Sequence, residues 1–260
     1  MVNFIAKDKY TFDDLIEIVR LLRAPGGCPW DQEQTHHSIR RNFLEEAYEA
    51  CEAIDEDNAD HMCEELGDVL LQVLFHADIE RERGRFTIDE VADGVCKKLI
   101  FRHPHVFGTT QADNTEQVLT NWDALKRVEK GQQTDTDTLH AVARSLPALW
   151  RAEKIQKKAE KAGIAVPTAV QAQALIISSA QELSAHSSAA ALGHLLFLSV
   201  AACRAAGIDP EQALTTASDQ FIEQFASLES ASQHSKTAMA ELTADQLGTL
   251  WSESSYSSKI

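Results

Sequence analysis

Apolar residues recur along this chain at the three- and four-residue spacing of amphipathic helices, and no sustained alternation typical of strands is present. Glycine and proline are sparse and divide the chain at only a few points. The pattern therefore predicts an all-α protein. Helices are expected over residues 11–23, 36–54, 60–83, 87–101, 115–130 and 146–161, followed by an Ala-rich helical region.

Residues that favour helix starts stand at three of these boundaries. Thr11 is expected to cap the first helix, and Asp60 the helix that begins at residue 60. Thr87 and Glu90 have the spacing of a capping box. The segment 24–29 (APGGCP) is expected to form a loop.

The segment 131–138 (GQQTDTDT) is short, polar and free of apolar residues, which is typical of a linker. We therefore expect a first domain over residues 1–132, a linker over 133–138 and a second domain over 139–260.

An internal repeat relates the two halves. Residues 64–71 read EELGDVLL, and 126 residues later residues 190–197 read AALGHLLF. The acidic stretch 45–49 has its counterpart in residues 178–182. The Leu-Gly pair and the apolar positions recur, whereas the acids are mostly lost, so the second half is expected to be a degenerate, structural copy.

Charge and cysteine content narrow the functional classes. The 24 basic and 40 acidic residues give a net charge of −16, which argues against binding a nucleic acid polymer through a basic surface. No apolar run approaches the roughly 18–20 residues of a membrane helix, and no signal peptide is read. The five cysteines are scattered without CxxC spacing, which favours reduced thiols and a cytoplasmic protein.

Acidic residues concentrate between Asn42 and Glu80, a stretch with thirteen Asp and Glu and no Lys or Arg. Two motifs stand out there, Glu45-Glu46-x-x-Glu49 and Glu65-x-x-Asp68. Positions three apart share one face of a helix, and in both motifs the acids border the apolar stripe at matching angles. Two antiparallel helices packed through these stripes are therefore predicted to present Glu46, Glu49, Glu65 and Asp68 at one seam.

Four carboxylates held that close would repel one another or take up protons unless a cation lay between them. Oxygen ligands without His or Cys suit Mg²⁺, with Mn²⁺ as a substitute. An ordinary amphipathic helix pair with a charged flank is the alternative. A di-iron bundle would need a Glu-x-x-His motif on two helices, and the chain offers only residues 33–36.

Basic and aromatic residues downstream are candidates for binding phosphates and a base. Lys98 and Arg102 close a helix, where cations are also ordinary partners of the helix dipole. Trp122 is a candidate stacking surface, and Lys126 lies one turn after it. The segment 103–105 (HPH) is interpreted as a packed loop, because proline prevents a helical pair of metal ligands.

Several motifs in this order resemble the MazG family: residues 27–31 (GCPWD), 45–49, 64–68, 102–107 (RHPHVF) and 144–149 (RSLPAL) leading to 154–158. The resemblance spans nearly the whole chain. It implies tandem all-α MazG domains, a homodimer, and Mg²⁺-dependent hydrolysis of nucleoside triphosphates to the monophosphate and pyrophosphate.

The same resemblance assigns expected roles by position. The metal ligands would be Glu46, Glu49, Glu65 and Asp68, with Glu45 as a further catalytic residue. Nucleotide or phosphate contacts would come from Asn42, His61, Glu64, Lys98, Arg102, Trp122 and Lys126.

The second copy departs from the pattern, because Ser178, Ser179, Ala191 and His194 stand at acidic positions and only Glu182 survives. A non-enzymatic alternative therefore stays open. In that alternative the chain is a regulatory or scaffolding dimer that binds nucleotide or a protein partner.

Overall fold

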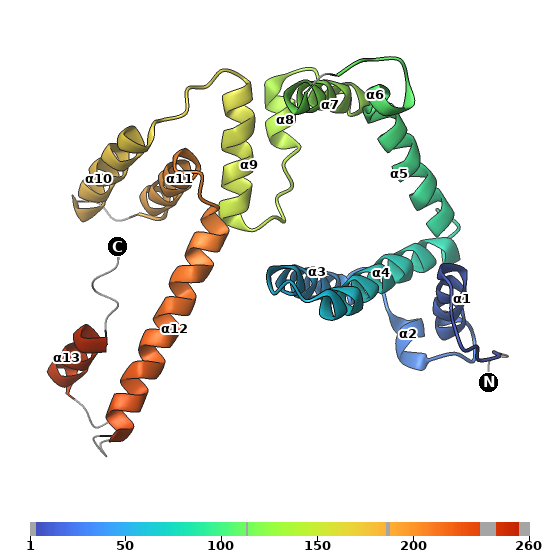
Figure 1. Ribbon diagram of the computed structural model, residues 1–260, viewed down its shortest axis with the longest axis horizontal. Helices are drawn as coiled ribbons and strands as arrows, with labels where there is room; N and C mark the ends of the chain where they lie inside the picture. Colours follow the sequence, from blue (N-terminus) through green and yellow to red (C-terminus); the bar gives the residue numbers. More distant parts are fainter. Residues whose placement is uncertain (1–3, 113, 186–187, 235–242, 255–260) are drawn as a thin grey trace. The chain divides into compact units, whose positions relative to one another are not determined.

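The computed structural model describes residues 4–112, 114–185, 188–234 and 243–254. Within these ranges the chain forms helices and no strand, which confirms the all-α prediction (Figure 1). The chain divides into two compact units, Met1–Lys126 and Arg127–Ile260. This division falls before the boundary expected at residue 132, and α8 (Asp135–His140) begins inside the segment 133–138 that was expected to be a linker.

Seven helices begin in the described residues of the first unit. They are α1 (Phe12–Arg23), α2 (Pro29–Glu33), α3 (Arg40–Asp55), α4 (Ala59–Glu82), α5 (Ile88–Arg102), α6 (Pro104–Phe107) and α7 (Thr115–Glu129), the last of which runs across the division. The longest of these helices is α4, and it packs against α1, α3 and α5.

Helix starts follow local capping chemistry. The side chain of Thr11 accepts from the Asp14 amide, and Thr87 and Glu90 form the predicted capping box of α5. The prediction for α4 was wrong, because Asn58 and not Asp60 is its N-cap, accepting from the His61 amide at 3.2 Å. Asp60 lies instead in the first turn, where a negative charge favours the helix dipole.

The short helix α2 lies partly in the segment predicted as a loop. Pro29 occupies its first turn, where the missing amide proton costs nothing. Its five residues are too few to display a helical apolar period.

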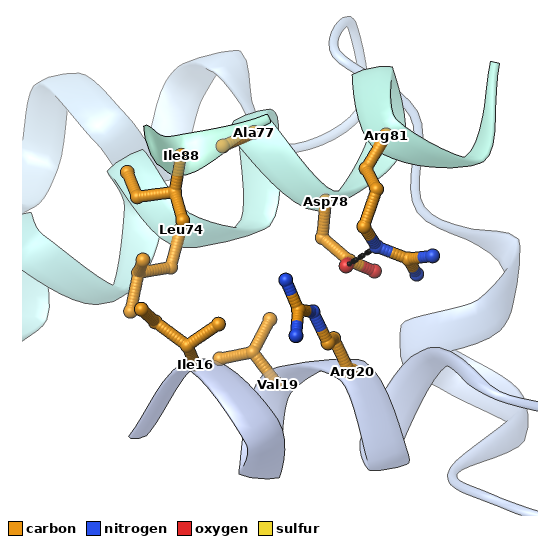
Figure 2. Close-up of a pocket in the computed structure, with 8 residues that line it drawn as sticks. All are labelled: Ile16, Val19, Arg20, Leu74, Ala77, Asp78, Arg81 and Ile88. Carbon is orange, nitrogen blue, oxygen red and sulfur yellow. Dashed lines mark hydrogen bonds and ion pairs between the residues drawn. The ribbon is translucent and has the colours of Figure 1, made fainter. Parts of the chain in front are cut away.

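The hydrophobic core of the first unit lies between α1 and α4. Val19 of α1 and Leu74, Phe75 and Ile79 of α4 are buried together with Ile39, which precedes α3. Figure 2 shows Val19 directed toward the α4 side chains at this contact. Burial of such side chains contributes about 1.5–3 kcal/mol each, so this contact anchors α4.

A buried ion-pair network joins α1, α2 and α4. Arg23 Nε lies 3.3 Å from Asp78 Oδ2, and Arg23 Nη2 lies 2.8 Å from Glu82 Oε2. Arg23 also donates to the backbone carbonyl of Asp31 in α2 at 2.6 Å. Asp78 in turn accepts from Arg81, as drawn in Figure 2. Each buried charge is thereby compensated, as a low-dielectric interior requires.

The second unit contains α8, α9 (Ala148–Lys161), α10 (Ala169–Ala185), α11 (Ala189–Ala205), α12 (Pro210–His234) and α13 (Ala244–Ser254). Helices α10 and α11 pack extensively against each other, and α9 packs on α11 and α12. Gln156 of α9 donates to the Phe197 carbonyl of α11 at 2.8 Å. Arg204 of α11 pairs with Glu160 of α9, so polar contacts fix this unit as well.

Among the described residues, no single helix has both the length and the apolar character needed to cross a membrane. Helix α11 and residues 210–230 of α12 meet those criteria only as a pair, and the pair is bent by 104°.

Candidate metal and nucleotide site

The helices α3 and α4 form an antiparallel pair because the turn between them is tight. Asp57 in this turn has a φ of 53°, a left-handed conformation that Asp tolerates better than most residues. Asn58 then caps α4 at once. The two acidic motifs, one on each helix, are therefore brought face to face.

Three carboxylates meet between these helices. Glu46 and Glu49 of α3 and Glu65 of α4 each offer an oxygen, and the three atoms lie within 4.8 Å of one another. Glu46 and Glu65 are partly buried, whereas Glu49 is exposed. Among the residues that the structure describes, this is the one group of three or more acidic, His or Cys side chains close enough to share a cation.

The electrostatics of the group favour a cation. Partial burial raises the pKa of Glu46 above its ordinary value, and the carboxylates of Asp68, Glu49 and Glu65 add to the rise. Glu65 Oε2 is buried without a hydrogen-bond partner. A buried, unpaired carboxylate oxygen is costly, and an ion with affinity for hard oxygen ligands would satisfy it. The donor set therefore fits Mg²⁺ or Mn²⁺.

Asp68 and Glu45 border the group in different ways. Asp68 is near enough to raise the pKa of Glu46, although its oxygens are not among the three that meet. Glu45 Oε1 accepts from Arg41 Nε at 2.9 Å on the solvent side of α3. Asn42 is partly buried one turn before Glu46, and Glu64 is exposed beside Glu65.

His61 bridges two acids at the start of α4. Its Nδ1 atom lies 3.0 Å from Glu56 Oε2 and its Nε2 atom lies 3.3 Å from Glu65 Oε1. The hydrogen bond to Glu56 is the main cause that raises the pKa of His61, and the negative charges of Glu56, Glu65 and Glu64 add to it. His61 therefore lies between Glu56 and one oxygen of Glu65.

A second group forms around Trp122 of α7. The guanidinium carbon of Arg102 lies 5.3 Å from the centre of the Trp122 ring, and Lys126 Nζ lies 4.7 Å from it. Arg102 is buried, and Lys98 lies one turn before it on α5. The structure thus brings three of the expected nucleotide contacts together. Helices α5 and α7 are not among those that pack extensively on α3 in the described residues, so the Trp122 group and the carboxylates form separate clusters.

The sequence did not indicate a third polar cluster, formed by His36, His76 and Glu80. The Nδ1 atoms of His36 and His76 lie 2.7 Å apart, and His36 Nε2 contacts Glu80. Arg85 also pairs with Glu80, and Phe43 of α3 packs edge-on against His76 at 5.7 Å between ring centres. These contacts tie the segment before α3 to α4. Their partners are about forty residues apart in the chain, so no local pattern could have revealed them.

The second unit repeats the helix pair without the acids. Ser178, Ser179 and the surviving Glu182 lie on α10, and Ala191 and His194 lie on α11. Glu182 and His194 belong to no candidate cation group among the described residues.

Comparison with known proteins points to one family. A model described as the MazG nucleotide pyrophosphohydrolase domain matches residues 34–107, a range that contains all three meeting carboxylates. The nucleoside triphosphate pyrophosphohydrolase/pyrophosphatase MazG of Thermotoga maritima is 39% identical over 92% of this chain and 94% of its own length. The nucleoside triphosphate pyrophosphohydrolase of Escherichia coli K12 is 37% identical over 84% of this chain and 86% of its own length. YabN of Bacillus subtilis is 38% identical over 94% of this chain, which spans only 51% of YabN.

Proposed function

Because this chain belongs to the MazG family, we propose that it is a nucleoside triphosphate pyrophosphohydrolase, which cleaves nucleoside triphosphates to the monophosphate and pyrophosphate. The meeting of Glu46, Glu49 and Glu65 between α3 and α4 is the structural observation that carries the proposal. Housekeeping of the nucleotide pool, in the cytoplasm, is the role that fits such an activity.

The cofactor in this proposal is Mg²⁺, with Mn²⁺ as a substitute, held by Glu46, Glu49, Glu65 and Asp68. When bound, the ion supplies charge neutralisation for phosphate oxygens and acidifies water. The protein itself carries a net charge of −16, so a polyanionic substrate needs such compensation.

The reaction proposed is an in-line attack of water on the α-phosphorus. A bond forms between the water oxygen and phosphorus, and the bond from phosphorus to the bridging oxygen of the leaving pyrophosphate breaks. Glu45 or Glu49 accepts the proton that the water loses. Of the two, Glu45 is the less available to take this proton, because one of its oxygens already accepts a hydrogen bond from Arg41.

Substrate contacts in the proposal come from both clusters of the first unit. Asn42, His61 and Glu64 border the carboxylates, and Lys98 and Arg102 offer positive charge to phosphate oxygens. Trp122 offers a ring face on which a base can stack, with Lys126 beside it.

We further propose that the chain forms a homodimer through helices of the first unit. Apolar side chains on three helices near the acidic motifs are exposed, and association would remove them from water. These are Leu44, Tyr48 and Ile54 on α3, Leu66 on α4, and Leu99, Ile100 and Phe101 on α5. The second unit is proposed to be a degenerate repeat of the first with a structural role, since α10 and α11 pack as a pair like α3 and α4.

Product analysis tests the function directly. The full chain is incubated with a panel of nucleoside triphosphates with and without Mg²⁺, and the products are separated by ion exchange. Monophosphate and pyrophosphate in equal amounts, formed only with the metal, are expected. Release of orthophosphate, or no product with any triphosphate, would overturn the proposal and favour the scaffolding alternative.

A further inference from the structure

A cavity of about 470 Å³ lies where α9 begins in the second unit. It is lined by Arg144, Leu146, Ala148 and Arg151. Its volume is in the range of small-molecule sites, which is roughly 300–1,000 Å³. The proposed catalytic chemistry uses none of these residues. Arg144, Leu146 and Ala148 belong to one of the sequence motifs that mark the family resemblance, and Arg151 follows that motif by two residues.

The two arginines of this cavity have no acidic partner among the described residues, although the chain as a whole is strongly acidic. Arg151 Nε is buried and makes no hydrogen bond. The Nε atoms of Arg23 and Arg204 are likewise buried without a hydrogen bond, but each of those guanidinium groups pairs with a carboxylate through Nη2. The partly buried guanidinium of Arg151 has no such carboxylate among the described residues, and a withdrawn N–H without an acceptor is costly, so the geometry calls for an acceptor from outside the chain.

The arginine side chains, and not the end of the helix, provide the binding groups. The first turn of α9 is already engaged, because the Trp150 amide donates to Glu211 Oε1 at 3.1 Å. No Asp or Glu lines the cavity, so nothing within it repels an anion. Leu146 and Ala148 add apolar surface beside the two guanidinium groups.

We propose that Arg144 and Arg151 bind a phosphate-bearing anion at a site in the second unit, separate from the carboxylate site of the first. Guanidinium groups present parallel N–H donors that match two oxygens of a phosphate group. Two such charges balance one phosphate group, which carries about −1.5 to −2 at neutral pH. The proposal does not depend on the catalytic activity of the first unit.

Titration calorimetry on the metal-free full chain tests this site. Metal is removed from the protein with a chelator, and the chelator is then removed by dialysis. The three probes are inorganic phosphate, pyrophosphate and adenosine monophosphate. Comparing the affinities of the three probes shows whether the site binds a free phosphate, a diphosphate or the phosphate group of a nucleotide. Binding of at least one probe is expected, weakened at least about tenfold by Arg144→Gln/Arg151→Gln.

Two further variants sharpen the test. Lys157→Gln/Lys158→Gln removes the same charge from the other end of α9 and should leave binding unchanged. Arg151→Lys keeps the charge but removes Nε, so intermediate affinity is expected; it also replaces the double variant if that variant fails to fold. No binding of any probe by the wild type overturns the proposal, as does equal binding by the Arg144 and Arg151 variants or equal weakening by the lysine pair.

Discussion

His61 and Glu65 lie one turn apart on α4, and His61 Nε2 is 3.3 Å from Glu65 Oε1. The second oxygen of Glu65, Oε2, is buried and makes no hydrogen bond. His61 therefore fixes the orientation of the carboxylate and leaves one oxygen to be satisfied beside Glu46 and Glu49. The proposed cation would satisfy this oxygen.

Glu65→Gln should abolish this arrangement while preserving the shape of the side chain. Pyrophosphate release is expected to fall by about 10²–10³-fold, the scale on which one preorganised electrostatic group acts. The measurement is steady-state release of pyrophosphate at saturating Mg²⁺, with circular dichroism as the check on folding. Glu52→Gln removes an exposed acid from α3 and serves as the matched control. Wild-type rates in Glu65→Gln would exclude the carboxylate from the chemistry.

Metal removal should reveal the repulsion between the carboxylates. In the absence of divalent ions, Glu46→Gln removes one of the clustered negative charges, so its Tm is expected to exceed that of the wild type. Adding Mg²⁺ should raise the Tm of the wild type, since an ion that binds only the folded state at 100 times its Kd stabilises it by about 2.7 kcal/mol. The Tm of Glu46→Gln should rise much less on addition of Mg²⁺.

Sodium chloride at equal ionic strength controls for screening. An equal response of both proteins to Mg²⁺ would place the ion elsewhere.

The sequence pattern could predict most helices and the common face of each acidic motif. Both follow from local spacing: Thr87 and Glu90 are three residues apart, as are Glu46 and Glu49. The start of α4 was misplaced because Asn58 and Asp60 are both good caps, and only the turn geometry selects between them.

Contacts between segments that are distant in the chain could not be predicted from local residue spacing. The Arg102–Trp122 contact joins two helices, and the cluster of His36 and Glu80 joins residues 44 apart in the chain. Such pairs depend on the angles at which helices pack, which apolar periodicity does not specify. The proximity of Lys126 to Trp122, by contrast, follows from one helical turn and was predicted.

The pH dependence of stability should report on Glu80. Arg85 and then His36 hold the pKa of this carboxyl at about 2, whereas an unfolded Glu titrates near about 4.3. The folded state thus favours the ionised form, so the stabilisation is present above about pH 4.3 and is lost as the pH falls toward 2. Urea unfolding of the wild type and Glu80→Gln at pH 6 and pH 3 measures this. The difference in free energy of unfolding between the wild type and Glu80→Gln should be smaller at pH 3 than at pH 6. An equal difference at both pH values would contradict the pairing of Glu80 with Arg85 and His36.

The two halves of the chain offer a matched pair of substitutions for locating the active unit. Glu182 on α10 occupies the repeat position of Glu49 on α3, yet it belongs to no group of three or more possible cation ligands among the described residues. Glu49→Gln is therefore expected to remove Mg²⁺-dependent pyrophosphate release, whereas Glu182→Gln should retain the wild-type rate. Both changes remove one charge from a helix surface, so they are equal in their effect on net charge and solubility. Loss of activity in Glu182→Gln with a normal Tm would assign a catalytic role to the second unit, and wild-type activity in Glu49→Gln would refute the site between α3 and α4.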